Sequence, residues 1–450
     1  MELKKYNANH TQVLKINQIV RTISETHKFD KDKLIAINTS DVENGVMGNG
    51  TLTFVDELKG QFKKTIVKDD ILFSEIRPAN RRFAKVTTKN TKDYVVSTKL
   101  MVLRKYNEDV DLEYFYYCLT NQPFLDILQR RAENRIGSFP QITFDLLSEY
   151  AFPIPPISEQ KRISSVISTL DKKIALNRQI NQNLEAMAKQ LYDYWFVQFD
   201  FPNEDGKPYK SSGGAMVWNE KLKRRIPEGW NVMSINEICT SCRGVSYGKD
   251  DLLSDSNGVL VLRGNNIENN RIVYDSNVAF VPNDFVSEEQ HIKEGDIIMT
   301  MSSGSKAHVG KCAMFHKDSE HTFGAFLSKF TPKKELRYMT FLFLTSEYFK
   351  SLITAFCNGT GINNLTNQTF DDVLLVLPDK NKTRMFESKV NNLFTMIGNN
   401  EENMRKLTKQ RDELLPLLMN GQVSVNSDLS VYKKRRGKVP SSIQNDVSDI

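Results

Sequence analysis

The sequence predicts an α+β fold: two similar mixed α/β domains separated by two long helices, which pack as an antiparallel coiled coil in a pseudo-two-fold internal repeat. Three observations predict it. A long apolar periodicity follows the first domain, the same periodicity returns near the end of the chain, and short motifs of the first domain recur in the second.

The first long helix is predicted within residues 158–199. Apolar residues recur there at steps of three, four or multiples of seven, the spacing of a coiled-coil seam. Its predicted seam contains Ile163, Leu170, Ile174, Asn177, Leu184 and Leu191. Pro155 and Pro156 end the preceding strand, and Ser158 is a suitable N-cap. Such a helix, roughly 57 Å long at 1.5 Å per residue, requires a packing partner.

The partner is predicted within residues 380–421. Its seam contains Phe386, Leu393, Ile397, Asn400, Leu407 and Leu414. A constant offset aligns Leu170 with Leu393 and places Asn177 at the seam position of Asn400. A polar residue at one seam position fixes the register of a coiled coil. The alternative interpretation is that these are two core helices of unrelated domains.

The domains 1–157 and 227–379 are predicted to be copies of one unit. Ile16-Asn17-Gln18-Ile19 returns as Ile235-Asn236-Glu237-Ile238, Val42-Glu43-Asn44 as Ile267-Glu268-Asn269, Asp70-Ile71-Leu72 as Asp296-Ile297-Ile298, and Phe144-Asp145 as Phe370-Asp371. Strands are expected at 51–55, 70–76 and 94–103, and a buried helix at 112–131 that returns at 336–353. A connector is expected at 200–226.

Composition sets further limits. The chain of 450 residues has a net charge of +6, which permits a polyanion partner without requiring one. No apolar run approaches the length of a membrane span, and no signal segment opens the chain, so we expect a cytoplasmic protein. Five cysteines indicate reduced thiols. The polar segment 422–450, with Lys433-Lys434-Arg435-Arg436 at its middle, is expected to be a disordered tail.

Motifs for catalysis are incomplete. Residues 244–248 match a nucleophile elbow around Ser246, but a polar loop follows where that motif needs a helix. Residues 304–311 resemble a phosphate loop with the wrong spacing. Cys239 and Cys242 have the spacing of half a zinc site, but Cys239 aligns with the apolar Val20, so a buried thiol is expected. The sequence predicts no catalytic residue, no metal and no cofactor bound by this chain.

The variable loops suggest recognition chemistry. Arg and Lys reach guanine edges, Asn pairs with adenine, and Ser holds phosphates. The candidate DNA-binding residues are Arg77, Arg81, Arg82 and Lys85 in the first copy and Arg263, Asn265, Asn266, Ser303, Lys306 and His308 in the second. Ordinary surface loops contain the same residue types, so the duplicated arrangement is what favours recognition.

Nearly the whole chain resembles the specificity subunit of a type I restriction-modification system. The resemblance rests on 153–163 (PIPPISEQKRI), on 200–209, and on 226–230 (IPEGW). Two departures are clear. No Ile-Pro-x-Gly-Trp entry precedes Ile16, and the second helix opens at 379–381 without the motif of the first.

The resemblance implies a non-catalytic subunit that binds double-stranded DNA. Two target recognition domains would each read half of a bipartite, asymmetric sequence, with the helices as a spacer. The partners would be two modification subunits, which bring S-adenosylmethionine, and, where present, two restriction subunits that use ATP and Mg. Two other hypotheses stay open: a coiled-coil protein-protein scaffold with two adaptor domains, and an enzyme with Ser246 as nucleophile.

Overall fold

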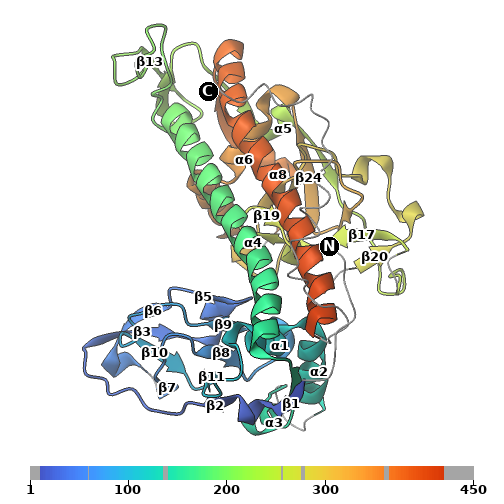
Figure 1. The fold of residues 1–450 in the computed structure, drawn as a ribbon. Coiled ribbons are helices and arrows are strands. Elements are labelled where there is room, and N and C mark those ends of the chain that lie inside the picture. The colour runs from blue at the N-terminus through green and yellow to red at the C-terminus, as the bar shows by residue number, and fades with distance from the viewer. Residues whose placement is uncertain are drawn as a thin grey trace, which may run out of the picture. The chain divides into compact units, whose positions relative to one another are not determined.

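The structure, a computed structural model, describes residues 11–58, 60–134, 140–254, 257–274, 279–358 and 364–419. The basic cluster of the predicted tail lies outside these residues. The chain divides into two compact units. Unit 1 contains Met1–Ile174 and Arg405–Ile450, and unit 2 contains Ala175–Met404. Each unit thus combines a globular part with one segment of each long helix, α4 (Ile157–Tyr192) and α8 (Lys380–Met419) (Figure 1).

Unit 1 is built on two four-stranded sheets. The first has the order β2 (Val20–Thr22), β11 (Leu100–Lys105), β8 (Ile71–Ser74), β9 (Phe83–Lys85), with antiparallel neighbours throughout. The second has the order β6 (Thr51–Phe54), β3 (Lys33–Ile37), β10 (Tyr94–Ser97), β7 (Phe62–Lys64). Short ladders join β1 (Gln12–Lys15) to β12 (Ala151–Ile154) and β4 (Val42–Glu43) to β5 (Val46–Met47). The helices are α1 (Leu112–Thr120), α2 (Gln122–Glu133) and α3 (Phe144–Ser148).

Unit 2 repeats the first four-stranded sheet and the helix pair of unit 1, and it adds a hairpin within residues 216–227. Its four-stranded sheet is β16 (Cys239–Arg243), β24 (Leu327–Pro332), β21 (Ile297–Thr300), β22 (Cys312–Met314). A three-stranded sheet contains β20 (Ala279–Val281), β17 (Val259–Leu262) and β23 (Thr322–Phe323). Two-stranded ladders pair β15 (Asn231–Ser234) with β25 (Leu374–Leu377), β18 (Ile267–Glu268) with β19 (Arg271–Ile272), and β13 (Met216–Asn219) with β14 (Arg224–Pro227). Its helices are α5 (Ile235–Ile238), α6 (Arg337–Leu344) and α7 (Glu347–Asn358).

The recurring motifs occupy equivalent places in the two units. Asp70 and Asp296 directly precede β8 and β21, which have the same neighbours in their sheets. Asn44 and Asn269 directly follow β4 and β18 and have positive φ angles of 46° and 48°, a conformation that Asn tolerates better than most residues. The repeat predicted from short motifs therefore extends to backbone conformation.

One predicted helix is wrong in detail. Residues 112–131 form two helices, α1 and α2, because Asn121 serves both. Its amide donates to the Tyr117 and Cys118 carbonyls, and its oxygen accepts from Phe124 N, which caps α2. The predicted strand 94–103 is likewise two strands, β10 and β11.

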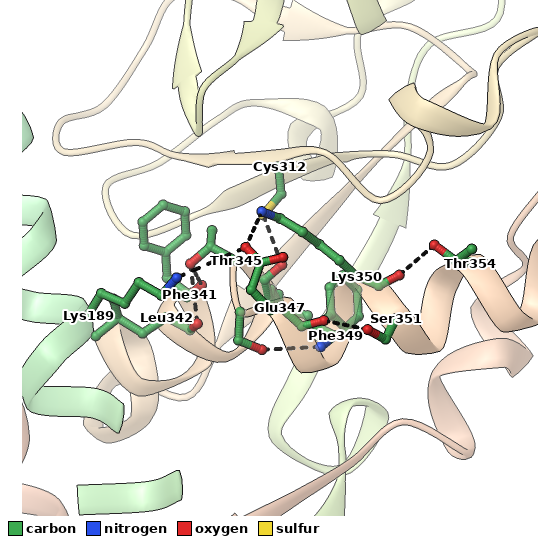
Figure 2. A network of polar contacts seen from close by, with 12 residues as sticks. Lys189, Cys312, Phe341, Leu342, Thr345, Glu347, Phe349, Lys350, Ser351 and Thr354 are labelled. Atoms are coloured by element: carbon green, nitrogen blue, oxygen red, sulfur yellow. Dashed lines mark hydrogen bonds and ion pairs between the residues drawn. The ribbon is translucent and has the colours of Figure 1, made fainter. Parts of the chain in front are cut away.

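The α6–α7 junction of unit 2 breaks in the same way with different residues. Figure 2 shows Thr345 Oγ1 donating to the carbonyls of Phe341 and Leu342 at the end of α6. Ser346 Oγ then accepts from Phe349 N and caps α7. The predicted single helix 336–353 is therefore also two helices.

The start of α4 differs from the prediction. Ser158 is not its N-cap, because the helix begins at Ile157. The Pro156 carbonyl accepts hydrogen bonds from Glu159 N at 2.8 Å and Gln160 N at 3.1 Å, so the first turn closes on proline. After Tyr192 the chain continues as a π-helical turn, Asp193–Val197.

The segments of α4 and α8 contact each other inside each unit. In unit 1, Ile163 and Ile167 share a core cluster with Leu415 and Leu418. In unit 2, Leu184 and Tyr192 share one with Ile397 and Phe386.

The pairwise contacts give the direction of the helices. In unit 1, Asp171 of α4 pairs with Arg411 of α8. In unit 2, Asn181 bonds to Asn400, while Tyr192 lies against Phe386. Later residues of α4 thus meet earlier residues of α8, so the paired segments run antiparallel.

The core clusters that contain residues of both long helices include seven of the predicted seam residues: Ile163, Leu184, Leu191, Phe386, Leu393, Ile397 and Leu414. Ile163, Ile174, Leu184, Phe386 and Ile397 are buried, whereas Leu170, Asn177, Leu191, Leu393, Asn400, Leu407 and Leu414 are partly buried. Asn400 does not pair with Asn177. Its amide donates to Asn181 Oδ1 at 2.8 Å, and Asn181 in turn donates to the Ile397 carbonyl. In an antiparallel pair, a step forward along one helix is a step backward along the other, so residues that align in sequence need not face each other. The partner of Asn400 is Asn181, one helical turn after the aligned Asn177.

Candidate nucleic-acid interface

A buried aspartate anchors the start of the same strand in each unit. Asp70 is 1% exposed and accepts two hydrogen bonds from Arg104 of β11, both at 2.8 Å. Asp296, 2% exposed, accepts from Thr331 of β24 and lies 3.4 Å from Lys329 Nζ. A buried carboxylate needs such partners. The loops that follow β8 and β21 therefore start from a fixed frame.

Arg81 and Arg82 end the loop that follows β8 in unit 1. Arg81 Nε donates to Asn44 Oδ1 at 2.7 Å, and its Nη1 donates to Gln122 Oε1. Burial, together with the nearby Arg411, lowers the pKa of Arg81. Arg82 donates to the carbonyl of Ser40 at 2.8 Å. Both guanidinium groups thus hold neighbouring turns in place.

Arg77 and Lys85, in the same region, differ in their exposure to solvent. Arg77 is exposed and has a φ of 45°, a left-handed conformation that a side chain other than glycine rarely adopts. Its backbone N–H donates to the Pro140 carbonyl at 3.0 Å, which helps to hold this turn. Lys85 is paired with Glu113 of α1. Of the four predicted residues in unit 1, Arg77 is the one that projects to solvent.

The corresponding loop of unit 2, residues 301–311, is longer than residues 75–82 of unit 1. Lys306 and His308 lie in an exposed single turn of 3₁₀ helix. His308 Nδ1 lies 3.2 Å from Lys311 Nζ. Ser303 is partly buried, and its hydroxyl accepts from Ser305 N at 3.3 Å. The loop therefore offers hydroxyl, imidazole and ammonium groups at one surface.

The turn after β17 contains the other three predicted residues. Arg263 Nε donates to the Tyr247 hydroxyl at 3.0 Å. Asn266 is 2% exposed, and it holds the turn by accepting from Arg263 N and donating to the Val273 carbonyl. Asn265 is exposed. Asn266 is therefore a structural residue, whereas Asn265 lies where a ligand could reach it.

Sequence reasoning missed two exposed residues at equivalent backbone positions. The carbonyl of Lys99 accepts from Glu75 N in unit 1, and the carbonyl of Phe326 accepts from Met301 N in unit 2. Both residues directly precede the strand that pairs with β8 or β21. Aligning the two copies through these strands would have revealed that a lysine and a phenylalanine share one site.

Two of the incomplete motifs lie in a loop and in a strand of unit 2. Ser246 is exposed in a loop after β16, and residues 247–254, which directly follow it, contain no helix such as a nucleophile elbow needs. Cys239 is buried as expected, and burial raises its pKa to about 12. All five cysteines are free thiols. Within the described ranges, no group of three or more His, Cys, Asp or Glu side chains could hold a metal ion, and no described helix is long and apolar enough to cross a bilayer.

The two units together define a duplicated α/β protein in which one strand frame supports two different sets of polar loops. The family model of the type I restriction modification DNA specificity domain matches residues 10–186 and 227–395. These matches cover most of the chain. The chain therefore belongs to this family and is a specificity subunit of a type I restriction-modification system.

Individual relatives agree with this assignment. The chain is 28% identical to the HindI specificity subunit of Haemophilus influenzae, over 91% of this chain and 98% of the relative. It is 31% identical to the EcoKI specificity subunit of Escherichia coli, over 43% and 41% of the two chains. The S subunit structure from M. genitalium covers 92% of this chain and 98% of its own, with a TM-score of 0.51 and 15% identity, a likeness of fold alone.

Proposed function

We propose that this chain binds double-stranded DNA at a bipartite, asymmetric sequence, with each unit reading one half-site. The observation that carries the proposal is the shared strand frame with different loops, in a chain that belongs to the specificity-domain family. Two different targets require two different sets of side chains on one scaffold. The domains 1–157 and 227–379 would then be the two target recognition domains.

The exposed predicted residues are the proposed DNA contacts. They are Arg77 in unit 1 and Asn265, Lys306 and His308 in unit 2. Cations would contact phosphates and guanine edges in the major groove, and Asn265 would pair with adenine. Arg81, Arg82, Arg263 and Asn266 are proposed to position these loops, because their polar groups already bond to neighbouring turns. Lys85 is held by Glu113 in the same way.

The long helices are the proposed spacer. The antiparallel contacts within each unit support a continuous coiled coil that relates the two domains by a pseudo-two-fold axis. Two modification subunits would bind the chain and supply S-adenosylmethionine, and restriction subunits would supply the chemistry that uses ATP and Mg. The chain itself would perform no catalysis.

Salt dependence tests the DNA-binding proposal. A reader that contacts about six phosphates should lose affinity with a slope on the order of −5 in a plot of log K against log salt. Binding of the full chain to duplexes from a random library, measured across salt concentrations, gives this slope. A chain that captures no duplex, or binds with no salt dependence, would instead support the scaffold hypothesis.

Insertion of one helical turn in either long helix tests the spacer. The gap between half-sites, expected near one turn of DNA, about 10 bp, should change while both half-sites stay the same. The control inserts the same residues beside Gly206, in the exposed turn that Asn203 closes. Methylation mapping that showed new half-sites with an unchanged gap would refute the spacer role.

A further inference from the structure

Phe326 is held at a junction of loops in unit 2 with its side chain in solvent. The residue is 71% exposed. Its carbonyl accepts from Met301 N at 2.9 Å and Ser302 N at 3.3 Å, the first amides of the loop that follows β21. Leu327 N donates to the Gly324 carbonyl at 2.8 Å and closes the turn that contains Phe326. The backbone at this position is therefore fixed, while the ring has no role in the core.

Neighbouring segments hold the other side of the turn. Val245 N donates to the Phe323 carbonyl at 2.7 Å, and Gly324 N donates to the Leu262 carbonyl at 2.9 Å. Gly244 approaches so closely that a Cβ atom there would lie 2.2 Å from the Gly324 oxygen. Val245, Leu262, Met301 and Ser302 thus bond to residues 323–326. The segments that continue from Leu262 and from Ser302 carry the proposed DNA contacts of this unit.

The side chains on these segments that reach the surface are mostly polar. Arg263, Asn265, Ser302 and Ser303 are exposed or partly exposed, and so is Tyr247, whose hydroxyl accepts from Arg263. Phe326 is the large apolar side chain among the exposed residues described at this surface. Base-pair edges in the major groove present one apolar group, the C5 methyl of thymine. The methyl group is therefore the feature of DNA that an aromatic ring in this setting can select.

We infer that Phe326 determines specificity by contacting the C5 methyl group of a thymine in the half-site that unit 2 reads. The inference rests on the proposed function. Unit 1 carries Lys99 at the same backbone position, with the same hydrogen bond from the loop after β8. A lysine at this position contacts phosphate. The same backbone position therefore selects a base in unit 2 and adds sequence-independent affinity for DNA in unit 1.

The test uses the full chain and duplexes in which deoxyuridine replaces each thymine of the unit 2 half-site in turn. One replacement should weaken binding by the wild-type chain about three- to fivefold, the effect of losing one buried methyl group. The F326A variant should bind thymine and deoxyuridine duplexes equally, with the affinity that the wild type has for the deoxyuridine duplex. F326L, which keeps an apolar side chain, should retain part of the preference.

Lys99→Ala is the matched control. It should weaken binding to all duplexes alike, reduce the salt slope by about 0.9, and keep the preference for thymine. The inference is overturned if F326A retains the full preference, if it weakens binding equally with and without thymine as a ring inserted between base steps would, or if the half-site contains no thymine on either strand. Salt-dependent duplex binding that persists in those cases leaves the proposed function intact. Absence of duplex binding by the wild type would contradict both the proposed function and the inference about Phe326.

Discussion

The two units attach their helix segments with different chemistry at equivalent positions. In unit 1, the Tyr117 hydroxyl of α1 donates to Asp171 of α4 at 2.7 Å, and Arg411 of α8 donates to the same carboxylate at 3.1 Å. In unit 2, the aligned residues are Phe341 and Phe394, whose ring centroids lie 5.9 Å apart. The fold thus requires a contact at this point, and either an ion pair or an aromatic pair can supply it.

The start of the first helix in each pair shows the same freedom. Asp111 caps α1 from its own chain segment, and Ser164 of α4 donates to that carboxylate. In unit 2, Glu387 of α8 accepts from Tyr338 N and Met339 N and caps α6 from outside. Burial raises the pKa of Glu387 to about 7 despite these bonds. Both units thus cap the first helix of the pair with a carboxylate, but the residue that provides it lies in a different segment in each unit.

The aromatic contact of unit 2 should give the largest effect. Phe394 is 2% exposed and stacks on Tyr338 with centroids 4.6 Å apart. Phe394→Ala should lower the free energy of unfolding of unit 2 by about 3–5 kcal/mol, because it leaves a cavity. Denaturant unfolding with hydrogen exchange resolved by peptide measures it. Tyr338→Phe is the control: it keeps the stacked ring and loses only the hydroxyl that donates to Asn391 at 2.9 Å, so it should cost about 1 kcal/mol. A loss below about 1 kcal/mol for Phe394→Ala would contradict the role of the ring.

The polar contact of unit 1 should give a smaller loss. Asp171→Ala leaves Arg411 partly buried without this carboxylate and removes the acceptor of Tyr117, so we expect about 2 kcal/mol by the same measurement. The unit 2 counterpart of Arg411 is the buried Ala188. Replacing all three groups with their unit 2 counterparts, as Tyr117→Phe, Asp171→Phe and Arg411→Ala, should restore stability to within about 1 kcal/mol. A triple variant less stable than Asp171→Ala would show that the two contacts are not interchangeable.

The sequence predicted the repeat because motifs such as Asp70-Ile71-Leu72 and Asp296-Ile297-Ile298 carry the buried frame, where few residue types fit. It did not predict the break at Asn121. A single asparagine within an apolar helical pattern does not interrupt that pattern, and only the structure shows that its side chain caps two helices. It predicted both Arg81 and Arg77 as DNA-binding residues. Only the three-dimensional partners Asn44 and Gln122 separate a structural arginine from an exposed one.

These two arginines supply the third prediction. Arg81→Ala should lower the stability of unit 1 by about 1–2 kcal/mol, because Asn44 and Gln122 lose a donor. Arg77→Ala should change stability by less than about 0.5 kcal/mol and weaken binding to every duplex, with a smaller salt slope. Thermal unfolding and duplex binding measure the two effects. Equal stability losses in both variants would show that Arg77 is also structural.

The smallest effect concerns a cluster of charges in unit 2 where α4 and α8 meet the sheet. Arg271 of β19 donates to Glu185 of α4 at 2.6 Å, and His316 Nε2 lies 3.9 Å from Glu401 of α8. Burial raises the pKa of Glu401 to about 7 and lowers that of His316 to about 4. Gly398 permits this approach, since a Cβ atom there would lie 2.7 Å from His316 Cβ.

The sign of the pH effect follows from these shifts. A raised carboxyl pKa means that the folded unit binds the proton more tightly than the unfolded chain, so the contribution of Glu401 is complete below about pH 4.5 and is lost as pH rises through 7. Glu401→Gln removes this loss. The variant should match the wild type near pH 5 and be more stable by about 1 kcal/mol at pH 8, a value reduced by screening because the side chain is 34% exposed.

The titration of His316 does not change the expected difference in stability between the wild type and Glu401→Gln. The lowered pKa of His316 costs stability as pH falls from 6.5 toward 4, but that cost is common to the wild type and to Glu401→Gln. Glu288→Gln, at an exposed carboxylate of unit 2, is the control and should change stability by less than about 0.5 kcal/mol at both pH values. A Glu401→Gln variant less stable than wild type at pH 8 would mean that the ionised carboxylate is needed there by Arg271, and that the charges of unit 2 act as a pair in the way that Asp171 and Arg411 do in unit 1.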